Sequence, residues 1–577
     1  MWFPEDLKAL QENPANGFQI AVWHELFDPF TPDSFQPRLL NSATLVDELR
    51  SAAERAHSVS VWRKHVHLIK EELALVANQE EDLLTLIPEF KWRLNSLFKM
   101  DHLGKLVLTC NLIREQRREY DALIFQNLLN SVESLPQKKD AALKSLRRLA
   151  TLAIHSGKAF EEFGDIVHTD NLTMSRRDLA TKLVTETTEQ EQEYLCVLSI
   201  SGDRSSVQRV SRKAGFDLLK KCEIELLALG EVPSTFVIGR VCAISARVAA
   251  RDCAKRIRRA LDVFNLYSNS AALNLLDDVH VKCGGQQDYR RFNLGDQALR
   301  KLHPRNRCGE LTVAALDCFS NGDGDERVFN ALELHSLAHG SAAARVKLVN
   351  LWSAAECLAG LEEADSVIER ICRVFAPIIM WRHVEKVVRY ISFNLQTLRD
   401  AGVKVSLGPG FPKSNEGNTV EAWETMVTLC KPKDHPDIVQ LLAFAANHPL
   451  LGFRVYSMWK DLTDPKQLRK TLLNSKQLIE WQFSRIYRAR NLVVHDGIEV
   501  PNLPSLLDNL HYYFSITISR ILHAMTIHHG WGLAESVAHW QAKVNYTLEM
   551  LEYAPQHLRI VDFFPGDRRA DSSPIWT

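Results

Sequence analysis

No apolar stretch in this 577-residue sequence is long enough to cross a membrane as a helix. The longest clear run, Val374–Trp381, is interrupted by Pro377 and stops at Arg382, whereas a membrane-spanning helix needs about 20 apolar residues. The N-terminal segment Met1–Asp6 lacks the basic and apolar regions of a signal peptide. We therefore expect a soluble protein located in the cytoplasm.

Several other features are also missing. The 11 cysteines are odd in number and scattered, without C-x-x-C spacing, which argues against a disulfide framework and a zinc ribbon. The G-x-x-x-x-G-K-[ST], G-x-G-x-x-G and G-x-S-x-G motifs are absent, which disfavours an ATPase, a dinucleotide-dependent enzyme or an α/β-hydrolase. His335 and His339 lie one helical turn apart, but no third ligand accompanies them. We therefore expect neither a metal nor a cofactor.

The charge balance limits how the protein can bind nucleic acid. The formal net charge is −1, which excludes a globally basic nucleic-acid binder, so any RNA contact must come from local patches. One such patch spans residues 466–490, where seven basic residues against the single acid Glu480 give +6. From this patch we predict RNA contacts by Lys476, Arg485 and Arg488 and base stacking by Tyr487. The alternative is that this helix face is only exposed to solvent and that Tyr487 packs against neighbouring side chains.

The length suggests two to four domains, and the patterns predict a mainly α protein. Apolar residues at helical spacing and sparse glycine and proline indicate amphipathic helices over residues 40–230. Segments rich in β-branched residues predict strands at Ser234–Ser245 and Asp277–Cys283, with a helix over Arg251–Leu266. We predict a helical N-terminal sensing or regulatory region at 1–232, a small α+β segment at 233–325 and a helical bundle at 326–577.

Within the bundle, residues 368–398 predict one long helix kinked at Pro377. A further helix should run from Pro465 to His495, ending before the helix-stop residue Gly497. The final major helix should follow Pro504, with an inward apolar face. The residues of that face are Leu507, Leu510, Phe514, Ile518, Ile521 and Met525. Loops are expected at Asn321–Asp325 and Gly408–Gly417.

One cluster in the Pro465–His495 helix suggests chemistry. Arg490 shares a helical face with Phe483, Ile486 and Val493, and a guanidinium on an apolar stripe needs a partner or a function. His495 follows five residues later, in the last turn of the predicted helix. The alternative is a structural ion pair for Arg490 and an ordinary polar helix end for His495.

The types of these residues suit RNA cleavage by attack of a 2′-OH on the neighbouring phosphorus. Histidine suits the two proton transfers because it titrates near neutral pH. The donors of Arg490 suit the extra negative charge on phosphorus. Asn491 is placed to hold a phosphate oxygen or orient His495.

The spacing of Arg490, Asn491 and His495 resembles the R-x4–6-H motif of HEPN superfamily ribonucleases. The upstream segment Leu348–Leu358, with Trp352 and Glu356 one turn apart, is similar to the earlier HEPN helix that carries an acidic residue. Over about residues 326–550 the chain resembles the Apea-like HEPN group linked to phage defence. The resemblance implies a homodimer, or a higher even oligomer, whose two motifs face one cleft.

The resemblance also implies a function. We expect a metal-independent endoribonuclease with an antiviral abortive-infection or toxin role. Its RNA substrate is expected to be structured or single-stranded, with tRNA as the best single candidate, and a phage-derived trigger or regulatory protein as a partner. Glu356 would pair with Arg490 and orient it, or else be an ordinary surface residue. Two alternatives remain: a non-catalytic HEPN-like module that binds RNA or a nucleotide, and a helical interaction scaffold.

Overall fold

The fold is taken from a computed structural model of the chain. The structure describes residues 10, 12–27, 40–59, 62–135, 137–155, 162, 166–187, 191–219, 235–267, 272–284, 288–293, 325–341, 343–400, 422–498, 500, 503–528 and 530–563. By its contacts the chain divides into two units. The first comprises Met1–Leu152, Val167–Val184 and Leu299–Thr577, and the second comprises Ala153–Ile166 and Thr185–Ala298. The expected mainly helical fold with a small α+β segment is confirmed.

The N-terminal part of the first unit is helical, as predicted. Asn41 starts one helix, because its side chain accepts a hydrogen bond from the Thr44 amide at 2.8 Å. Leucine, isoleucine and alanine side chains from successive helices form one buried core. The helices are α2 (Pro14–Phe27), α3 (Ser42–Ala56), α4 (Trp62–Gln79), α5 (Glu81–Leu84), α6 (Pro88–Phe98), α7 (Leu103–Glu115), α8 (Arg117–Glu133), α9 (Lys139–His155), η2 (Thr169–Thr173) and α10 (Arg176–Thr187).

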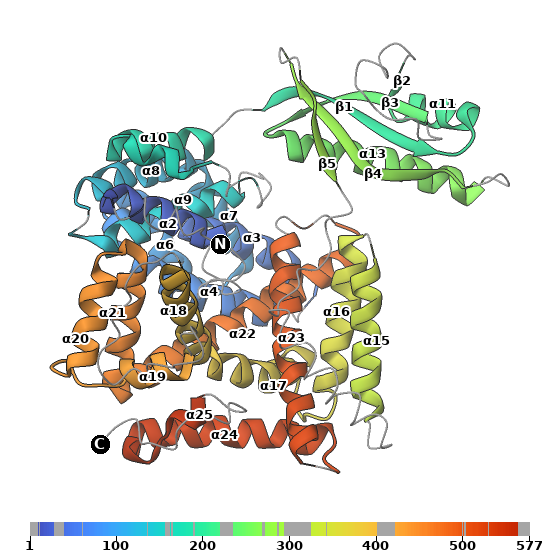
Figure 1. The fold of residues 1–577 in the computed structure, drawn as a ribbon. Coiled ribbons are helices and arrows are strands. Elements are labelled where there is room, and N and C mark those ends of the chain that lie inside the picture. Colours follow the sequence, from blue (N-terminus) through green and yellow to red (C-terminus); the bar gives the residue numbers. More distant parts are fainter. Residues whose placement is uncertain are drawn as a thin grey trace. The chain divides into compact units, whose positions relative to one another are not determined.

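The C-terminal part of the first unit is a helical bundle. Its elements are α15 (Glu326–Gly340), α16 (Ala344–Ala359), α17 (Val367–Trp381), α18 (His383–Asp400), α19 (Ala422–Leu429), α20 (Pro436–Ala446), α21 (Pro449–Thr463), α22 (Pro465–His495), α23 (Leu503–Ile527), α24 (Leu533–Tyr553), η3 (Pro555–His557) and α25 (Ile560–Phe563). The long α22 packs against α4, α16, α17, α21, α23 and α24 (Figure 1). Phe483 anchors it, with ring centroids 5.5 Å from Phe375 and 5.0 Å from Tyr513.

The second unit contains a five-stranded antiparallel sheet in the order β2-β3-β1-β4-β5. Its elements are β1 (Gln192–Ser201), α11 (Arg204–Lys213), β2 (Asp217–Leu218), β3 (Thr235–Ala243), α13 (Ala246–Tyr267), β4 (Asn274–Cys283) and β5 (Arg290–Asn293). Both helices cover one face of the sheet (Figure 1), where alternate β1 residues meet the apolar face of α13. The chain order of strands and helices is that of the split βαβ motif.

Several boundaries differ from the prediction. The expectation of helices throughout 40–230 is wrong over Gln192–Ser201, which is the central strand β1. Its two faces are both largely buried and apolar, which hides the alternation that marks a half-exposed strand. The predicted boundary between residues 232 and 233 therefore falls inside the second unit. The strands β3 and β4 and the helix α13 confirm the three elements predicted beyond it.

The bundle confirms the predicted α22 and corrects two other helices. Residues 368–398 form two helices that separate at Arg382, while α17 continues through Pro377. Proline lacks the amide that would bond the carbonyl of Arg373, and Gln541 Nε2 donates to that carbonyl instead, at 3.3 Å. Helix α23 buries its predicted inward face, but it is not the final long helix, because α24 follows.

Two predicted loops fall largely outside the described residues, namely Gly408–Gly417 and all of Asn321–Asp325 except Asp325. No described helix combines the length and the apolar character needed to cross a membrane.

Candidate functional site at the C-terminal end of α22

The candidate site lies where α22 ends. The Asp464 side chain accepts from the Lys466 amide at 3.0 Å, and Pro465 occupies the first helical turn, so the helix start is encoded locally. At the other end Gly497 has a φ of 62°, a conformation that glycine adopts without strain. The Ile498 amide then donates to the Leu492 carbonyl at 3.2 Å. The predicted stop at Gly497 is confirmed, and it leaves His495 exposed in the last turn.

Arg490, Asn491 and His495 all lie on this last part of the helix. The Arg490 guanidinium donates from Nη1 to Asn491 Oδ1 at 3.2 Å. Asn491 and His495 are four residues apart, so they lie on the same side of the helix, one turn from each other. Arg490 is half-buried, and its Nε has no hydrogen-bond partner among the described residues. A shielded donor without an acceptor is uncommon in folded proteins and calls for an explanation.

Two further arginines converge on the same helix end. Arg55, at the end of α3, forms an ion pair with Asp496, the residue that follows His495. Arg345, at the start of α16, donates from Nη1 to the Gly497 carbonyl at 3.2 Å. These residues lie 441 and 152 positions from their partners, so no local sequence pattern marks them. Three guanidinium groups, including that of Arg490, thus lie at this helix end, and Asp496 carries the carboxylate that pairs with one of them.

The predicted contact between Glu356 and Arg490 is not among the interactions of the described residues. Instead, the Glu356 carboxylate accepts from the Trp352 indole Nε1 at 2.7 Å. The two residues are one turn apart in α16, which places the indole within reach of the carboxylate. Their predicted placement on the same side of one helix is confirmed. Glu356 therefore fixes the buried Trp352 ring, which in turn lies 5.4 Å from the Tyr487 ring.

The predicted RNA contacts of Arg485 and Arg488 do not fit their positions. Both side chains are buried. Arg485 pairs with Glu48 and Glu72, each at 2.8 Å, and Arg488 pairs with Glu48 at 2.7 Å. Because Glu48 belongs to α3 and Glu72 to α4, these arginines join α22 to the N-terminal helices rather than to a ligand.

The pKa values in this network reflect deep burial. Burial raises the pKa of Glu72, and Arg485 opposes that shift. The pKa of Arg485 is raised, because the carboxylates of Glu48 and Glu72 outweigh its burial. Burial lowers the pKa of Arg488, and the carboxylate of Glu48, its ion-pair partner, only partly opposes that shift. The network is thus a compensated set of buried charges.

The other two predicted RNA contacts, Tyr487 and Lys476, have protein partners of their own. Tyr487 is half-buried between the rings of Trp352 and His65, at 5.4 and 5.7 Å, which fits the packing alternative better than base stacking. Lys476 is part-exposed and 3.8 Å from Glu480. It lies 14 residues before Arg490, about 21 Å along the helix axis. Of the seven basic residues of the +6 patch, Arg485 and Arg488 are therefore taken up by packing, while Lys466 and Lys470 stay exposed.

The histidines and acids of the described residues form no candidate metal site. His335 faces His511, with 3.2 Å between Nε2 and Nδ1, and burial lowers the pKa of His335 to about 4. No group of three or more histidine, cysteine, aspartate or glutamate side chains is placed to hold a metal ion within the part of the chain that the structure describes.

No protein-family model, curated protein or solved structure matches the chain. The chemistry at the end of α22 is therefore the basis for assigning a function.

Proposed function

We propose that the chain is a metal-independent endoribonuclease of the HEPN type, with Arg490, Asn491 and His495 as its catalytic residues. The observation that carries this proposal is the convergence at the exposed end of α22. There an accessible histidine lies one turn from an asparagine that is hydrogen-bonded to Arg490. Arg345 adds positive charge at the same place, where Arg55 pairs with Asp496. Such a combination suits a phosphodiester substrate.

Each group has a role in the proposed reaction. Neutral His495 removes the proton of the ribose 2′-OH, whose oxygen attacks the adjacent phosphorus. The guanidinium of Arg490 and the amide of Asn491 stabilise the phosphorane oxygens. The bond from phosphorus to the 5′-oxygen then breaks, and a protonated histidine donates the proton that this leaving oxygen needs. The products are a 2′,3′-cyclic phosphate and a 5′-OH.

The acid and the base call for two histidines, whereas each chain supplies one motif histidine. We therefore propose a homodimer in which His495 of each protomer faces a shared cleft. The apolar face of α23 is covered within the chain itself, since Leu510 and Ile521 are fully buried, so it does not offer this contact. The side chains of Val346, Val494 and Ile498 are 47%, 44% and 44% exposed. They border the motif, so we place the dimer contact there.

The biological setting is proposed from the HEPN resemblance. An unregulated ribonuclease is toxic to its host, so a cytoplasmic role in antiviral abortive infection, or as a toxin, suits this activity. RNA is the substrate class, and the anticodon loop of tRNA is the best single candidate. A phage-derived trigger or a regulatory protein would then release the activity, and the N-terminal helices that hold α22 are the region on which it would act.

The test is cleavage of total RNA by the purified chain, with the products mapped by sequencing of their ends. Cleavage should persist in EDTA, and a substrate with a single 2′-deoxy sugar at the cut position should resist it, because the nucleophile is gone. Cleavage of that substrate, or loss of activity in EDTA that Mg²⁺ restores, would contradict the mechanism. RNA that is bound in a salt-dependent manner but left intact would favour the non-catalytic binding module.

A further inference from the structure

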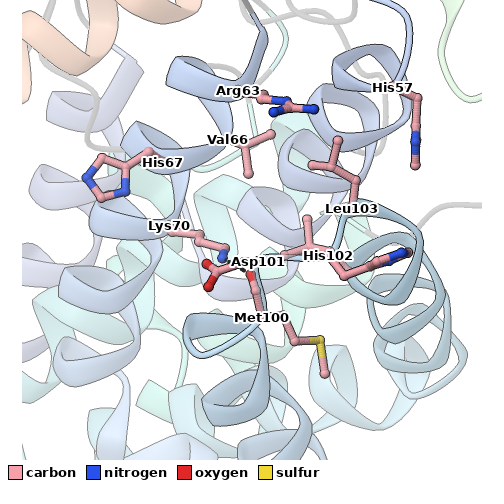
Figure 2. A pocket seen from close by; sticks show the side chains of 10 residues that line it. His57, Arg63, Val66, His67, Lys70, Met100, Asp101, His102 and Leu103 are labelled. Atoms are coloured by element: carbon pink, nitrogen blue, oxygen red, sulfur yellow. Dashed lines mark hydrogen bonds between the residues drawn. The ribbon is translucent and has the colours of Figure 1, made fainter. Parts of the chain in front are cut away.

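A cavity of about 400 Å³ lies in the N-terminal part of the first unit (Figure 2). It is bordered by α4, by the residue that ends α3 and by the turn that leads into α7. Its size falls within the range of small-molecule sites, about 300 to 1,000 Å³. The lining residues are His57, Arg63, Val66, His67, Lys70, Met100, Asp101, His102, Leu103 and Leu106.

Positive charge dominates the polar part of this lining. Arg63 and Lys70 project from one face of α4, and Figure 2 shows them opposite His57 and the turn that carries Asp101 and His102. The one acid of the lining is Asp101. Among the residues that the structure describes, no carboxylate pairs with Arg63. Arg63 is exposed, so its guanidinium is free to pair with an anion in the cavity.

Lys70 gives a second indication. Its ammonium donates to the Met100 carbonyl. Burial lowers the pKa of Lys70, and Asp101 only partly opposes that shift. A partly desolvated cation with a single carbonyl acceptor gains from a second anion beside it. The cavity lining thus carries the two cationic side chains of Arg63 and Lys70 against the one carboxylate of Asp101.

The remaining wall is apolar and suits the organic part of a ligand. Val66, Leu103 and Leu106 belong to α4 and α7, and Met100 precedes the turn. His102 sets the start of α7, because its Nδ1 accepts from the Lys105 amide at 3.4 Å. A neutral His102 that accepts through Nδ1 carries its proton on Nε2, so this ring keeps a donor to offer.

We propose that this cavity binds a small organic phosphate monoester of about mononucleotide size. A phosphate monoester carries close to two negative charges at neutral pH, which matches Arg63 and Lys70 better than a carboxylate does. The apolar wall takes the base or another organic group. Binding at this site does not depend on the proposed ribonuclease activity.

A ligand in the cavity would lie against helices that contact the motif helix α22. Helix α4 presents Arg63 and Lys70 to the cavity, while His65 and Glu72 contact Ser484 and Arg485 of α22. His57 is two residues from Arg55, which holds Asp496 beside the motif. A ligand in the cavity would therefore contact the elements that position the end of α22.

The experiment is isothermal titration calorimetry of the full chain carrying His495→Ala, so that heat from RNA cleavage does not interfere. The probes are adenosine 5′-monophosphate, adenosine, inorganic phosphate and a 5′-phosphorylated tetranucleotide. We expect the monophosphate to bind and adenosine to bind at least about tenfold more weakly, because it lacks the charged group. Inorganic phosphate should bind more weakly than the monophosphate but compete with it.

Two variants and a matched control locate the site. Arg63→Gln and Lys70→Gln should each weaken monophosphate binding by about tenfold, as expected for one charge-assisted hydrogen bond. Lys105→Gln removes the same charge from an exposed position on α7 outside the lining, and it should leave binding unchanged.

Three results would overturn the proposal: no binding of the monophosphate or of inorganic phosphate up to about 1 mM, equal affinities in Arg63→Gln and Lys105→Gln, or tighter binding of the tetranucleotide than of the monophosphate. The last result would assign the surface to RNA ends.

Discussion

Removal of Arg485 should detach the N-terminal helices from the motif helix. Its guanidinium connects Glu48 of α3 and Glu72 of α4 to α22, with both N···O distances at 2.8 Å. Arg485→Met keeps the aliphatic stem but leaves the buried Glu72 carboxylate without its ion-pair partner. Burial already raises the pKa of Glu72 against the opposing effect of Arg485, so loss of Arg485 drives this carboxyl towards its neutral form.

The size of the effect follows from the burial. The side chains of Arg485 and Glu72 are 10% and 4% exposed, and breaking such a pair by removing one partner costs about 3 to 5 kcal/mol. The double variant Arg485→Met/Glu72→Leu removes both charges, so it should recover a large part of that loss. Arg469→Met is the matched control, because Arg469 also lies on α22 but pairs with Glu552 at the surface. Its loss should cost less than about 1 kcal/mol.

The assay is hydrogen–deuterium exchange of the full chain, followed on peptides from α4 and α22. Arg485→Met should speed exchange in both helices by at least about a hundredfold, since each 1.4 kcal/mol is a factor of ten. Arg469→Met should leave exchange in α4 unchanged. Equal exchange in the two single variants, or no recovery in the double variant, would refute the argument that a buried charge network holds α4 on α22.

Two further predictions concern the pH dependence of stability from His65 and the proposed dimer contact. Burial, with Arg488 and Lys64 adding to it, lowers the pKa of His65 to about 4, so the folded state favours neutral His65. The stability from this residue is present above about pH 6.5 and is lost as the pH falls towards 4, at a cost of about 3 kcal/mol. Calorimetric melting temperatures should therefore depend less on pH in His65→Gln than in the wild type, and an unchanged slope would contradict this. For the dimer, Val494→Asp with Ile498→Asp should give monomers that no longer cleave RNA, whereas Val439→Asp, at an exposed position on α20, should do neither. Light scattering gives the oligomeric state and a cleavage assay gives the activity, both over the same dilution series. A fully active monomer would rule out a shared cleft.

Local signals made much of the fold predictable. Asp464, Pro465 and Gly497 mark the two ends of α22, and the structure confirms these ends. The β-branched run at Ser234–Ser245 likewise identifies β3. Strand β1 was missed, because a central strand buried on both faces has no alternation of apolar and polar residues to separate it from a helix.

The surroundings of the site were less predictable. The basic residues of α22 suggested an RNA-binding face, yet Arg485 and Arg488 are neutralised by Glu48 and Glu72, which lie more than 400 positions earlier in the chain. Arg55 is another such case, since it reaches Asp496 across 441 positions. Pairings at this range are set by tertiary packing, so the spacing of residues along one helix carries no information about them.

The most direct measurement of the central claim is the rate of RNA cleavage by the purified chain beside that of His495→Ala. The matched control is His339→Ala, because His339 is also exposed in the last turn of a helix of the same unit. Loss of the proton carrier should slow cleavage at least about a hundredfold, with the fold and the RNA affinity retained, while His339→Ala should cut at the wild-type rate. Cleavage by His495→Ala at the wild-type rate would contradict the account.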